Sequence, residues 1–295
     1  MERRLALDGP IDVVETLRAF DSGTRGGGSR AAGGWWIGNT AAGPATLHVR
    51  VVGGALHGEA WGAGADLTLD RLASLCGLDD DPTAFRPPPG PVADLHRRHP
   101  GLRIGRTSEV FDTLVPVILG QRVASEQAIG SFRSIARTWG SPAPGPVDGW
   151  VAPPAALLAS LDPDELHPYG VERSRALILR EAARRARRLE EAVGMDHNAA
   201  YRRLTAVRGI GPWTAGHVAG AALGDPDAVP VGDFHLPNTV AWVLAGEPRA
   251  DDARMLELLE PYRPHRRRVM LLLRFARVKA PALAAKRPVH DIRGR

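Results

Sequence analysis

The segment with the clearest chemical meaning is residues 204–216, in which two glycines separated by one residue directly precede a proline. Gly209 and Gly211 allow a tight turn and a close approach of the backbone to a ligand. Pro212 suits the first turn of a helix, where its missing N–H costs little. The free N–H groups at the start of that helix, together with its dipole, can hold an anion. A DNA phosphate fits this arrangement, because main-chain donors grip the nucleic-acid backbone without reading base sequence.

A carboxylate, that of Asp233, follows the turn and precedes Phe234 and His235. The residue type allows two interpretations. Asp233 can cap the N-terminus of the helix that follows it, as aspartate often does, or it can act as a reacting carboxylate beside a substrate. Asp225 and Asp227, which lie nearer to the turn, are interpreted as loop residues.

The elements that must position these groups are helices. Residues 200–223 are expected to form a helical hairpin around the turn, and the second helix carries small residues that let two helices pack closely. Apolar spacing also predicts helices that begin near Ser108 and Ser125, each with a serine cap, and a long helix over residues 174–193. Pro116 should bend the first of these helices or delay its start.

The N-terminal part has a different pattern. Alternation of apolar and polar residues over 45–52 and 55–61, with Gly53-Gly54 between them, predicts a β-hairpin. Short helices are expected over residues 13–20 and 70–76. This mixture indicates a small α/β unit with an antiparallel sheet.

A proline-rich run at residues 86–91 separates the two patterns, because it can form neither a helix nor a central strand. We therefore expect an N-terminal α/β domain over residues 1–88 and a helical domain over residues 89–295. The predicted fold class is α+β, with most of the chain in helices.

Composition narrows the possible partners. The chain of 295 residues has a net charge of +5 and a sequence pI of about 10.1, which suits a polyanion, although many arginine-rich proteins bind no nucleic acid. Its single cysteine, Cys76, excludes an internal disulfide framework and any four-cysteine zinc or iron–sulfur site. Neither a signal-peptide pattern nor an apolar run of about 18 residues is present. We expect a cytoplasmic protein that associates with the nucleoid and not with membranes.

Four segments of the helical part resemble the helix-hairpin-helix (HhH-GPD) DNA glycosylase superfamily, and within it most closely the bacterial 3-methyladenine DNA glycosylase II group. These segments are His99-Pro100-Gly101-Leu102-Arg103, Ile118-Leu119-Gly120-Gln121-Arg122-Val123, Tyr169-Gly170-Val171 and the residues up to Leu179, and Gly209-Ile210-Gly211-Pro212-Trp213-Thr214-Ala215. The family follows its hairpin with a loop and a catalytic aspartate, often in an Asp-x-His setting. The resemblance covers residues 95–275 and implies a helical core in two lobes with DNA between them.

The resemblance assigns the catalytic role to Asp233. Its carboxylate would stabilise the oxocarbenium character of the sugar as the N-glycosidic bond breaks, and it would orient or deprotonate the attacking water. Bifunctional members carry a lysine nucleophile at the start of the second hairpin helix, and this chain has Trp213 there. Since no lysine occurs before Lys279, the resemblance implies hydrolysis by water without strand-nicking lyase activity.

The resemblance also implies a pocket for a base that has been flipped out of the duplex. Trp213, His217 and Phe275 would line it, and an indole face stabilises positively charged alkylated purines. Packing between the hairpin helices is the alternative role for Trp213, and an ordinary surface or core position is the alternative for His217. Two departures from the group stand out: Arg208 replaces a proline of the hairpin, and Arg274 lies in the expected aromatic wall, where it would disfavour a cationic base.

Further residues are assigned to DNA by the same resemblance. The expected DNA contacts are Gln121, Arg122, Gly209, Gly211 and Thr214. Arg122 stands at the position of the wedge that fills the gap left by the flipped base, where better-known members have an aliphatic residue, and a solvated surface arginine is the alternative. The backbone carbonyls of Thr205, Val207 and Gly209 would hold a monovalent cation at the hairpin. No other cofactor is expected.

These features together favour a monofunctional DNA glycosylase that removes alkylated purines such as 3-methyladenine and 7-methylguanine. One alternative is a related glycosylase for another lesion, such as hypoxanthine or an oxidised or bulky adduct. The other is a non-catalytic damage-recognition protein that uses the same hairpin. In each case we expect a monomer that binds damaged double-stranded DNA.

Overall fold

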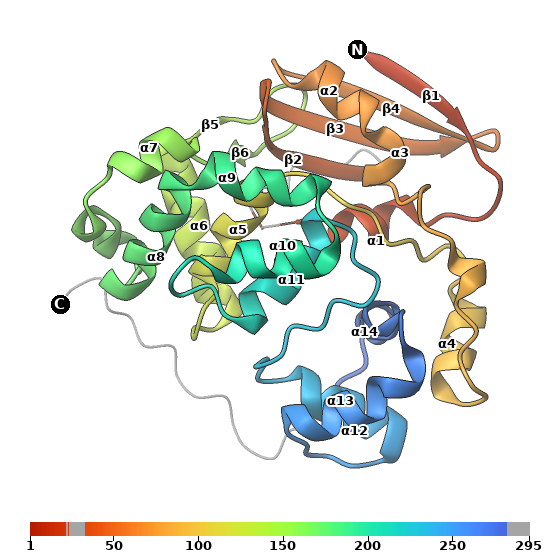
Figure 1. Cartoon of the computed structure of the whole chain (residues 1–295). Helices are drawn as coiled ribbons and strands as arrows, with labels where there is room; N and C mark the ends of the chain where they lie inside the picture. The colour runs from red at the N-terminus through yellow and green to blue at the C-terminus, as the bar shows by residue number, and fades with distance from the viewer. Residues whose placement is uncertain (22, 24–32, 282–295) are drawn as a thin grey trace.

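The computed structural model describes residues 1–21, 23 and 33–281. An N-terminal sheet covers one end of a helical body, and the last helices form a separate group below it (Figure 1). Of the two lysines, Lys286 lies outside the described residues. Within the described part of the chain, no helix is long and apolar enough to cross a membrane.

The N-terminal unit is a four-stranded antiparallel sheet in the order β1-β4-β3-β2. Its strands are β1 (Glu2–Ala6), β2 (Gly34–Thr40), β3 (Gly43–Val52) and β4 (Ala55–Trp61). The predicted β-hairpin is confirmed, because Gly53 (φ 57°) and Gly54 (φ 72°) take the left-handed backbone conformation that a two-residue turn between β3 and β4 requires.

Three short helices cover one face of this sheet: α1 (Val13–Arg18), α2 (Ala65–Asp70) and α3 (Leu72–Leu75). Leu17 and Leu72 pack there against Leu47 and Leu56 of the sheet, and all four side chains are fully buried. The helix expected over residues 70–76 is wrong in its bounds, because the backbone leaves the helical conformation at Arg71 and divides the segment into α2 and α3.

The larger helical lobe is built around α5 (Val110–Leu119), whose apolar side chains are buried on nearly every side. The helix continues through Pro116, so the expected late start does not occur. Around α5 lie α6 (Ser125–Trp139), α7 (Ala155–Ser160), α8 (Arg173–Arg184), α9 (Ala186–Glu190), α10 (His197–Thr205) and α11 (Pro212–Ala222), together with the short pairs β5 (Ser141–Pro142) and β6 (Trp150–Val151), and the 3-10 turns η2 (Pro163–Tyr169) and η3 (Glu191–Gly194). The long helix expected over residues 174–193 is thus divided, at Arg185.

The smaller helical lobe combines two distant parts of the chain. Its elements are α4 (Pro91–Arg98), α12 (Leu236–Ala245), α13 (Asp252–Leu259), η4 (Glu260–Tyr262) and α14 (Arg266–Phe275). Phe85, which follows the short turn η1 (Pro82–Ala84), packs into the same apolar cluster. The α+β class and the helical core in two lobes are therefore confirmed.

A buried cation connects the smaller lobe to the segment that precedes it. Arg268 of α14 is fully buried and forms an ion pair with Asp80. Its guanidinium also donates to the carbonyl of Leu102 at 3.4 Å and lies 5.9 Å from the centre of the Phe85 ring. Because a buried charge is tolerated when it is paired and hydrogen-bonded, these contacts hold α14 against residues 80–102.

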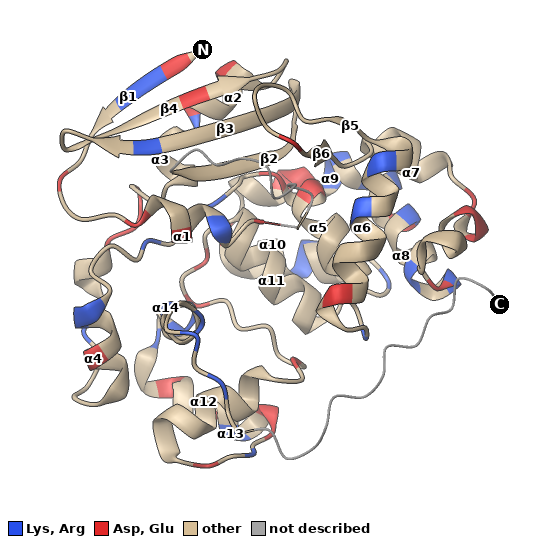
Figure 2. Cartoon of the chain, turned by 180° about the vertical axis from the view of Figure 1, so that it is seen from behind, with Lys and Arg blue, Asp and Glu red and all other residues tan. Residues whose placement is uncertain are grey.

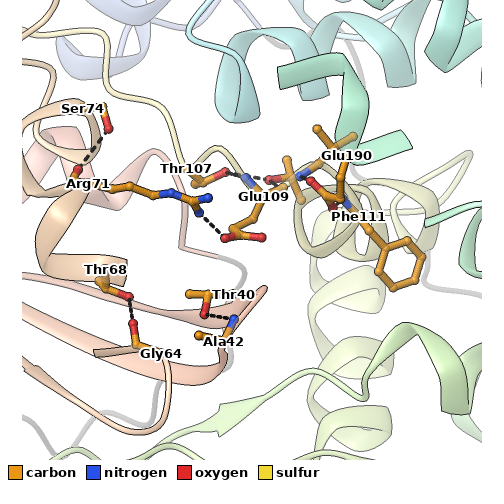
Figure 3. A network of polar contacts seen from close by, with 12 residues as sticks. Thr40, Ala42, Gly64, Thr68, Arg71, Ser74, Thr107, Glu109, Phe111 and Glu190 are labelled. Carbon is orange, nitrogen blue, oxygen red and sulfur yellow. Dashed lines mark hydrogen bonds and ion pairs between the residues drawn. The ribbon is translucent and has the colours of Figure 1, made fainter. Parts of the chain in front are cut away.

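A group of buried carboxylates lies where the sheet unit meets the large lobe (Figure 3). Glu109 pairs with Arg71, and Glu190 accepts hydrogen bonds from the backbone N–H groups of Val110 at 2.9 Å and Phe111 at 2.7 Å. Glu190, and not the expected Ser108, therefore satisfies the first donors of α5. Burial raises the pKa of Glu109 to about 7, against the opposing effect of Arg71.

Candidate active site and hairpin

The hairpin forms as the glycine spacing predicts. Helix α10 ends at Thr205, the chain turns at Gly209 with φ 91°, and α11 begins at Pro212. A side chain at Gly209 would run into Ile178 of α8, so both the backbone conformation and the space require glycine there. A side chain at Gly211 would meet nothing within 4 Å. The backbone at the start of α11 is therefore open to an approaching ligand.

The loop after α5 is bound to this turn. Gln121 donates from its amide nitrogen to the carbonyl of Gly209 at 3.0 Å and to the hydroxyl of Thr214 at 2.9 Å. The buried guanidinium of Arg175 donates to the carbonyl of Leu119 at 2.8 Å and so fixes the end of α5. Three of the residues expected at DNA thus lie together at the hairpin.

Arg122 comes next to Gln121 and has a different environment. Its side chain is exposed, and its backbone is in the left-handed conformation with φ 59°, which few residues other than glycine adopt. The loop therefore presents Arg122 to solvent beside the hairpin. This placement fits both the wedge and the surface-arginine interpretation.

The Asp233 carboxylate accepts three hydrogen bonds within the protein. One oxygen accepts from the backbone N–H groups of His235 and Leu236, both at 2.8 Å, so Asp233 does cap the start of α12. The other oxygen accepts from the indole N–H of Trp213 at 3.1 Å. The cap and the placement beside Trp213 therefore coexist in one side chain.

These donors decide the charge of Asp233. Burial is the largest single effect and raises the pKa of the carboxyl, but the hydrogen bonds from Trp213, Leu236 and His235 together outweigh it. The pKa of Asp233 is consequently lowered, and the group is an anion at neutral pH. A fixed carboxylate with this charge is suited to stabilise a neighbouring cation.

Trp213 is partly exposed and lies outside the apolar core of the large lobe. Its indole ring lies near Gly120, where an added Cβ would come within 3.7 Å of it, and meets the His217 ring edge-on, with 4.6 Å between the ring centres. Burial, reinforced by Arg267, lowers the pKa of His217 to about 4, so this imidazole is neutral at physiological pH. Trp213, His217 and Asp233 thus form one cluster, and core packing alone does not describe Trp213.

Phe275, also expected in the pocket, packs elsewhere. Its ring meets that of His99, with centres 4.6 Å apart, and makes no ring contact with Trp213 or His217 in the part of the chain that the structure describes. Its neighbour Arg274 donates to the carbonyl of Arg18 at 3.2 Å. The C-terminal end of α14 therefore faces the N-terminal unit.

Two residues near the cluster escaped the sequence analysis. Arg267 of α14 lies against Gly220 of α11, where any side chain at position 220 would overlap its guanidinium. Phe234, directly after Asp233, is 84% exposed, which is unusual for an aromatic side chain. The run of three arginines at 266–268 was the only sequence signal for Arg267, and it does not distinguish the three residues.

Two of the three carbonyls expected to hold a cation, those of Val207 and Gly209, already accept hydrogen bonds. That of Val207 accepts from the N–H of Ile210 at 3.0 Å, and that of Gly209 accepts from Gln121. Each carbonyl oxygen has a second lone pair, so these bonds leave room for a cation, and the cation stays a prediction. Among the described residues there is no group of histidine, cysteine and carboxylate side chains that could hold a metal ion.

Comparison with known proteins places this arrangement in a family. Residues 115–264 match the model of the HhH-GPD superfamily base excision DNA repair protein. The chain is 31% identical over 172 residues to a probable bifunctional transcriptional activator/DNA repair enzyme AlkA of Mycobacterium tuberculosis, and this match covers 56% of the chain and 34% of the relative. It is 27% identical over 177 residues to a DNA-3-methyladenine glycosylase of Bacillus subtilis, covering 57% of each protein.

A solved structure extends the likeness of the fold to nearly the whole chain. The 3-methyladenine DNA-glycosylase from Archaeoglobus fulgidus superposes with a TM-score of 0.75 at 19% identity, over 93% of this chain and 98% of that one. The chain spans about a third of the length of the mycobacterial relative and little more than half of the Bacillus one. With the family model matched over half of its length, the chain belongs to the HhH-GPD superfamily of base excision DNA repair proteins.

Proposed function

We propose that this protein is a monofunctional DNA glycosylase that hydrolyses the N-glycosidic bond of alkylated purines in double-stranded DNA. The observation that carries the proposal is the Asp233 carboxylate, which is ionised and fixed beside Trp213 and next to the hairpin. The names of the Mycobacterium and Bacillus relatives support the same class of activity.

In the proposed reaction the bond to the base breaks ahead of the attack of water, and positive charge develops on the sugar. Asp233 stabilises this charge because its own negative charge is held in place by the Trp213 N–H and two backbone N–H groups. Lone pairs that these donors leave free can also orient the attacking water. The carboxylate needs no reorganisation during the reaction, since its hydrogen bonds are already formed.

Water is the proposed nucleophile, and we expect no lyase activity. The position of the lysine nucleophile of bifunctional family members is occupied by Trp213, whose indole nitrogen cannot form a Schiff base. The first lysine of the sequence, Lys279, lies beyond α14. The products are therefore the free base and an abasic site in an unbroken strand.

DNA is held, in this proposal, by the hairpin and the loop after α5. The open backbone at Gly211 offers donors to a phosphate, and Arg122 enters the gap that the flipped base leaves. Basic residues occur on α4, α6, α8 and α14, interspersed with acidic ones (Figure 2). The charge pattern thus favours local phosphate contacts over one continuous basic face. We propose a monomer as the active form.

The test is base release from duplexes that each carry one lesion, by the wild type and by Asp233→Asn. The panel contains 7-methylguanine, 3-methyladenine, hypoxanthine, 8-oxoguanine and uracil, with and without subsequent alkali. We expect release of methylated purines, strand cleavage only after alkali, and loss of both in the variant. Cleavage without alkali would contradict the monofunctional assignment, and tight binding without release of any base would show a non-catalytic protein.

A further inference from the structure

Three consecutive arginines at the start of α14 differ in their partners. Arg266 forms hydrogen bonds and an ion pair with Asp227, the shortest at 2.6 Å, and Arg268 is paired with Asp80. The guanidinium of Arg267, by contrast, has no hydrogen bond and no ion pair to any residue that the structure describes. Its Nε is buried without a partner, as is that of Arg268, but the other two guanidinium nitrogens of Arg268 have partners. Buried charges are normally paired, so the middle arginine requires an explanation.

Its position gives one. Arg267 lies across Gly220, on the face of α11 that also carries Trp213 and His217. At a rise of 1.5 Å per residue, Trp213 and Gly220 lie roughly 10 Å apart along the helix axis. The carboxylate of Asp233 is at the Trp213 end of this face, and the Arg267 guanidinium is at the other end. A base attached to a sugar beside Asp233 would extend along this face toward Arg267.

The polar groups along this face lack partners. The Nε2 atom of His217 is buried without a hydrogen bond to any described residue, as is the Nε of Arg267. Burial, with a further contribution from Arg274, lowers the pKa of Arg267 to about 10, which leaves it protonated at neutral pH. An unsatisfied buried donor costs free energy, and an acceptor atom of a ligand would recover that cost.

We infer that Arg267 is a specificity-determining residue that recognises the flipped base by donating hydrogen bonds to a carbonyl oxygen, so that purines with a 6-carbonyl are favoured over purines without one. The inference rests on the proposed glycosylase function. A guanidinium matches the O6 and N7 acceptors of an unmethylated 6-oxopurine such as hypoxanthine, the commonest specific contact between arginine and guanine. In 7-methylguanine the methyl group occupies N7, so only O6 is left to accept. The long side chain can turn aside from Gly220 when a base enters.

The positive charge of Arg267 adds a second preference. The charge repels a cationic base, whereas a neutral base has no net charge to be repelled. Four lesions separate the two effects: 7-methylguanine is cationic with a 6-carbonyl, 3-methyladenine is cationic without one, hypoxanthine is neutral with one, and 1,N6-ethenoadenine is neutral without one. Hypoxanthine therefore gains most from Arg267, and 3-methyladenine gains least.

The experiment measures single-turnover release of these four bases by the wild type, Arg267→Met and Arg267→Lys. Each variant is compared with the wild type on the same lesion, which removes differences in the intrinsic lability of the bases. Arg97→Met serves as the matched control, since Arg97 is an exposed arginine of α4 with 73% of its side chain accessible. Thermal denaturation of each variant checks that it is folded.

We expect Arg267→Met to lower the release of hypoxanthine roughly 5- to 100-fold and that of 7-methylguanine less, because only O6 accepts there and its charge is repelled. Release of 3-methyladenine should be unchanged or raised. Arg267→Lys keeps the charge and loses the planar fork, so it should lose the carbonyl preference and still disfavour cationic bases. Gly220→Ala, which displaces the guanidinium without removing it, should change the ranking in the same direction as Arg267→Met.

Two results would overturn the inference while the glycosylase function stands. One is an equal loss on all four lesions, which would indicate a structural role for Arg267. The other is a ranking of the four lesions that is the same in the wild type and in Arg267→Met. If the wild type releases none of the four bases, the proposed function fails, and the inference fails with it.

Discussion

Two carboxylates in this molecule each accept two backbone N–H groups at the start of a helix, yet their pKa values move in opposite directions. Asp233 caps α12 and has a lowered pKa, whereas Glu190 caps α5 and has a raised one. Burial raises the pKa of both, and the main difference in hydrogen bonding is the indole N–H of Trp213. Asp233 has this third donor and Glu190 does not, and among the effects that lower the pKa of Asp233 the hydrogen bond from Trp213 is the largest.

The largest expected effect is that of Asp233→Asn on base release. The substitution removes the negative charge and keeps a side chain that can still cap α12. We expect kcat/KM to fall by roughly 100- to 1,000-fold, as for loss of electrostatic stabilisation in other active sites, with little change in thermal stability. Asp112 of α5 lies away from Asp233, and its carboxylate accepts a hydrogen bond from the side chain of Asn39 in β2 at 3.0 Å. Asp112→Asn, the same substitution there, is the control and should retain activity. Similar losses in both variants would remove the contrast between the two regions.

A smaller effect is expected for Trp213→Phe, which removes the third donor. Without it, the balance at Asp233 resembles that at Glu190, so the pKa of Asp233 should rise. Because the Asp233 carboxylate must be ionised to act, activity is then lost at a higher pH as the solution is acidified. The acid limb of the pH profile of kcat/KM should therefore move to higher pH. At neutral pH we expect a loss of about 10-fold, the value of a hydrogen bond to a charged group. An unmoved acid limb would show that Trp213 acts only as a pocket wall.

The smallest effect concerns stability rather than activity. Burial raises the pKa of Glu109 from 4.5 to about 7 and that of Asp112 from 3.8 to about 6. Between these limits the folded protein holds more protons than the unfolded chain, so the free energy of unfolding should fall as pH rises from about 4 to about 7. Asp112→Asn should reduce this fall by on the order of 3 kcal/mol.

Urea denaturation of the wild type and of Asp112→Asn at several pH values in this window measures the change. Asp112 is the better choice for substitution, because Glu109 pairs with Arg71 and its removal would leave that cation without its partner. The same slope in both proteins would mean that Asp112 does not titrate differently in the folded and unfolded states.

The sequence predicted the hairpin, which depends on neighbouring residues, but it did not predict strand pairing between segments far apart in the chain. Gly209 and Gly211 indicate their turn because a tight turn requires residues without a side chain, and glycine is recognised directly in the sequence. The strands β1 and β2 were not expected, since β1 pairs with β4 across more than fifty residues, from Glu2 to Glu59. The sequence pattern of a strand is weak when its partner decides its stability.

The site shows the same division. The family resemblance assigned Trp213 and Asp233 to one site, and the structure joins them by a hydrogen bond. The orientation of Phe275 toward His99 and the isolation of Arg267 depend on which side chains from other elements reach them. The three adjacent arginines cannot be distinguished in the sequence. They differ in the structure because Asp227 and Asp80 form ion pairs with two of them.

The ion pair between Asp80 and Arg268 joins residues 188 positions apart. On a ribosome, Asp80 emerges long before α14 is synthesised, and domains fold as their residues become available. The apolar cluster that supports the Asp233 loop includes Val269 and Leu272 of α14 together with Val92 and Val229. A nascent chain that ends before α14 therefore carries the hairpin and Asp233 but lacks the last helix of the lobe that packs around the Asp233 loop. The surroundings of Asp233 are therefore complete only after the hairpin has been synthesised.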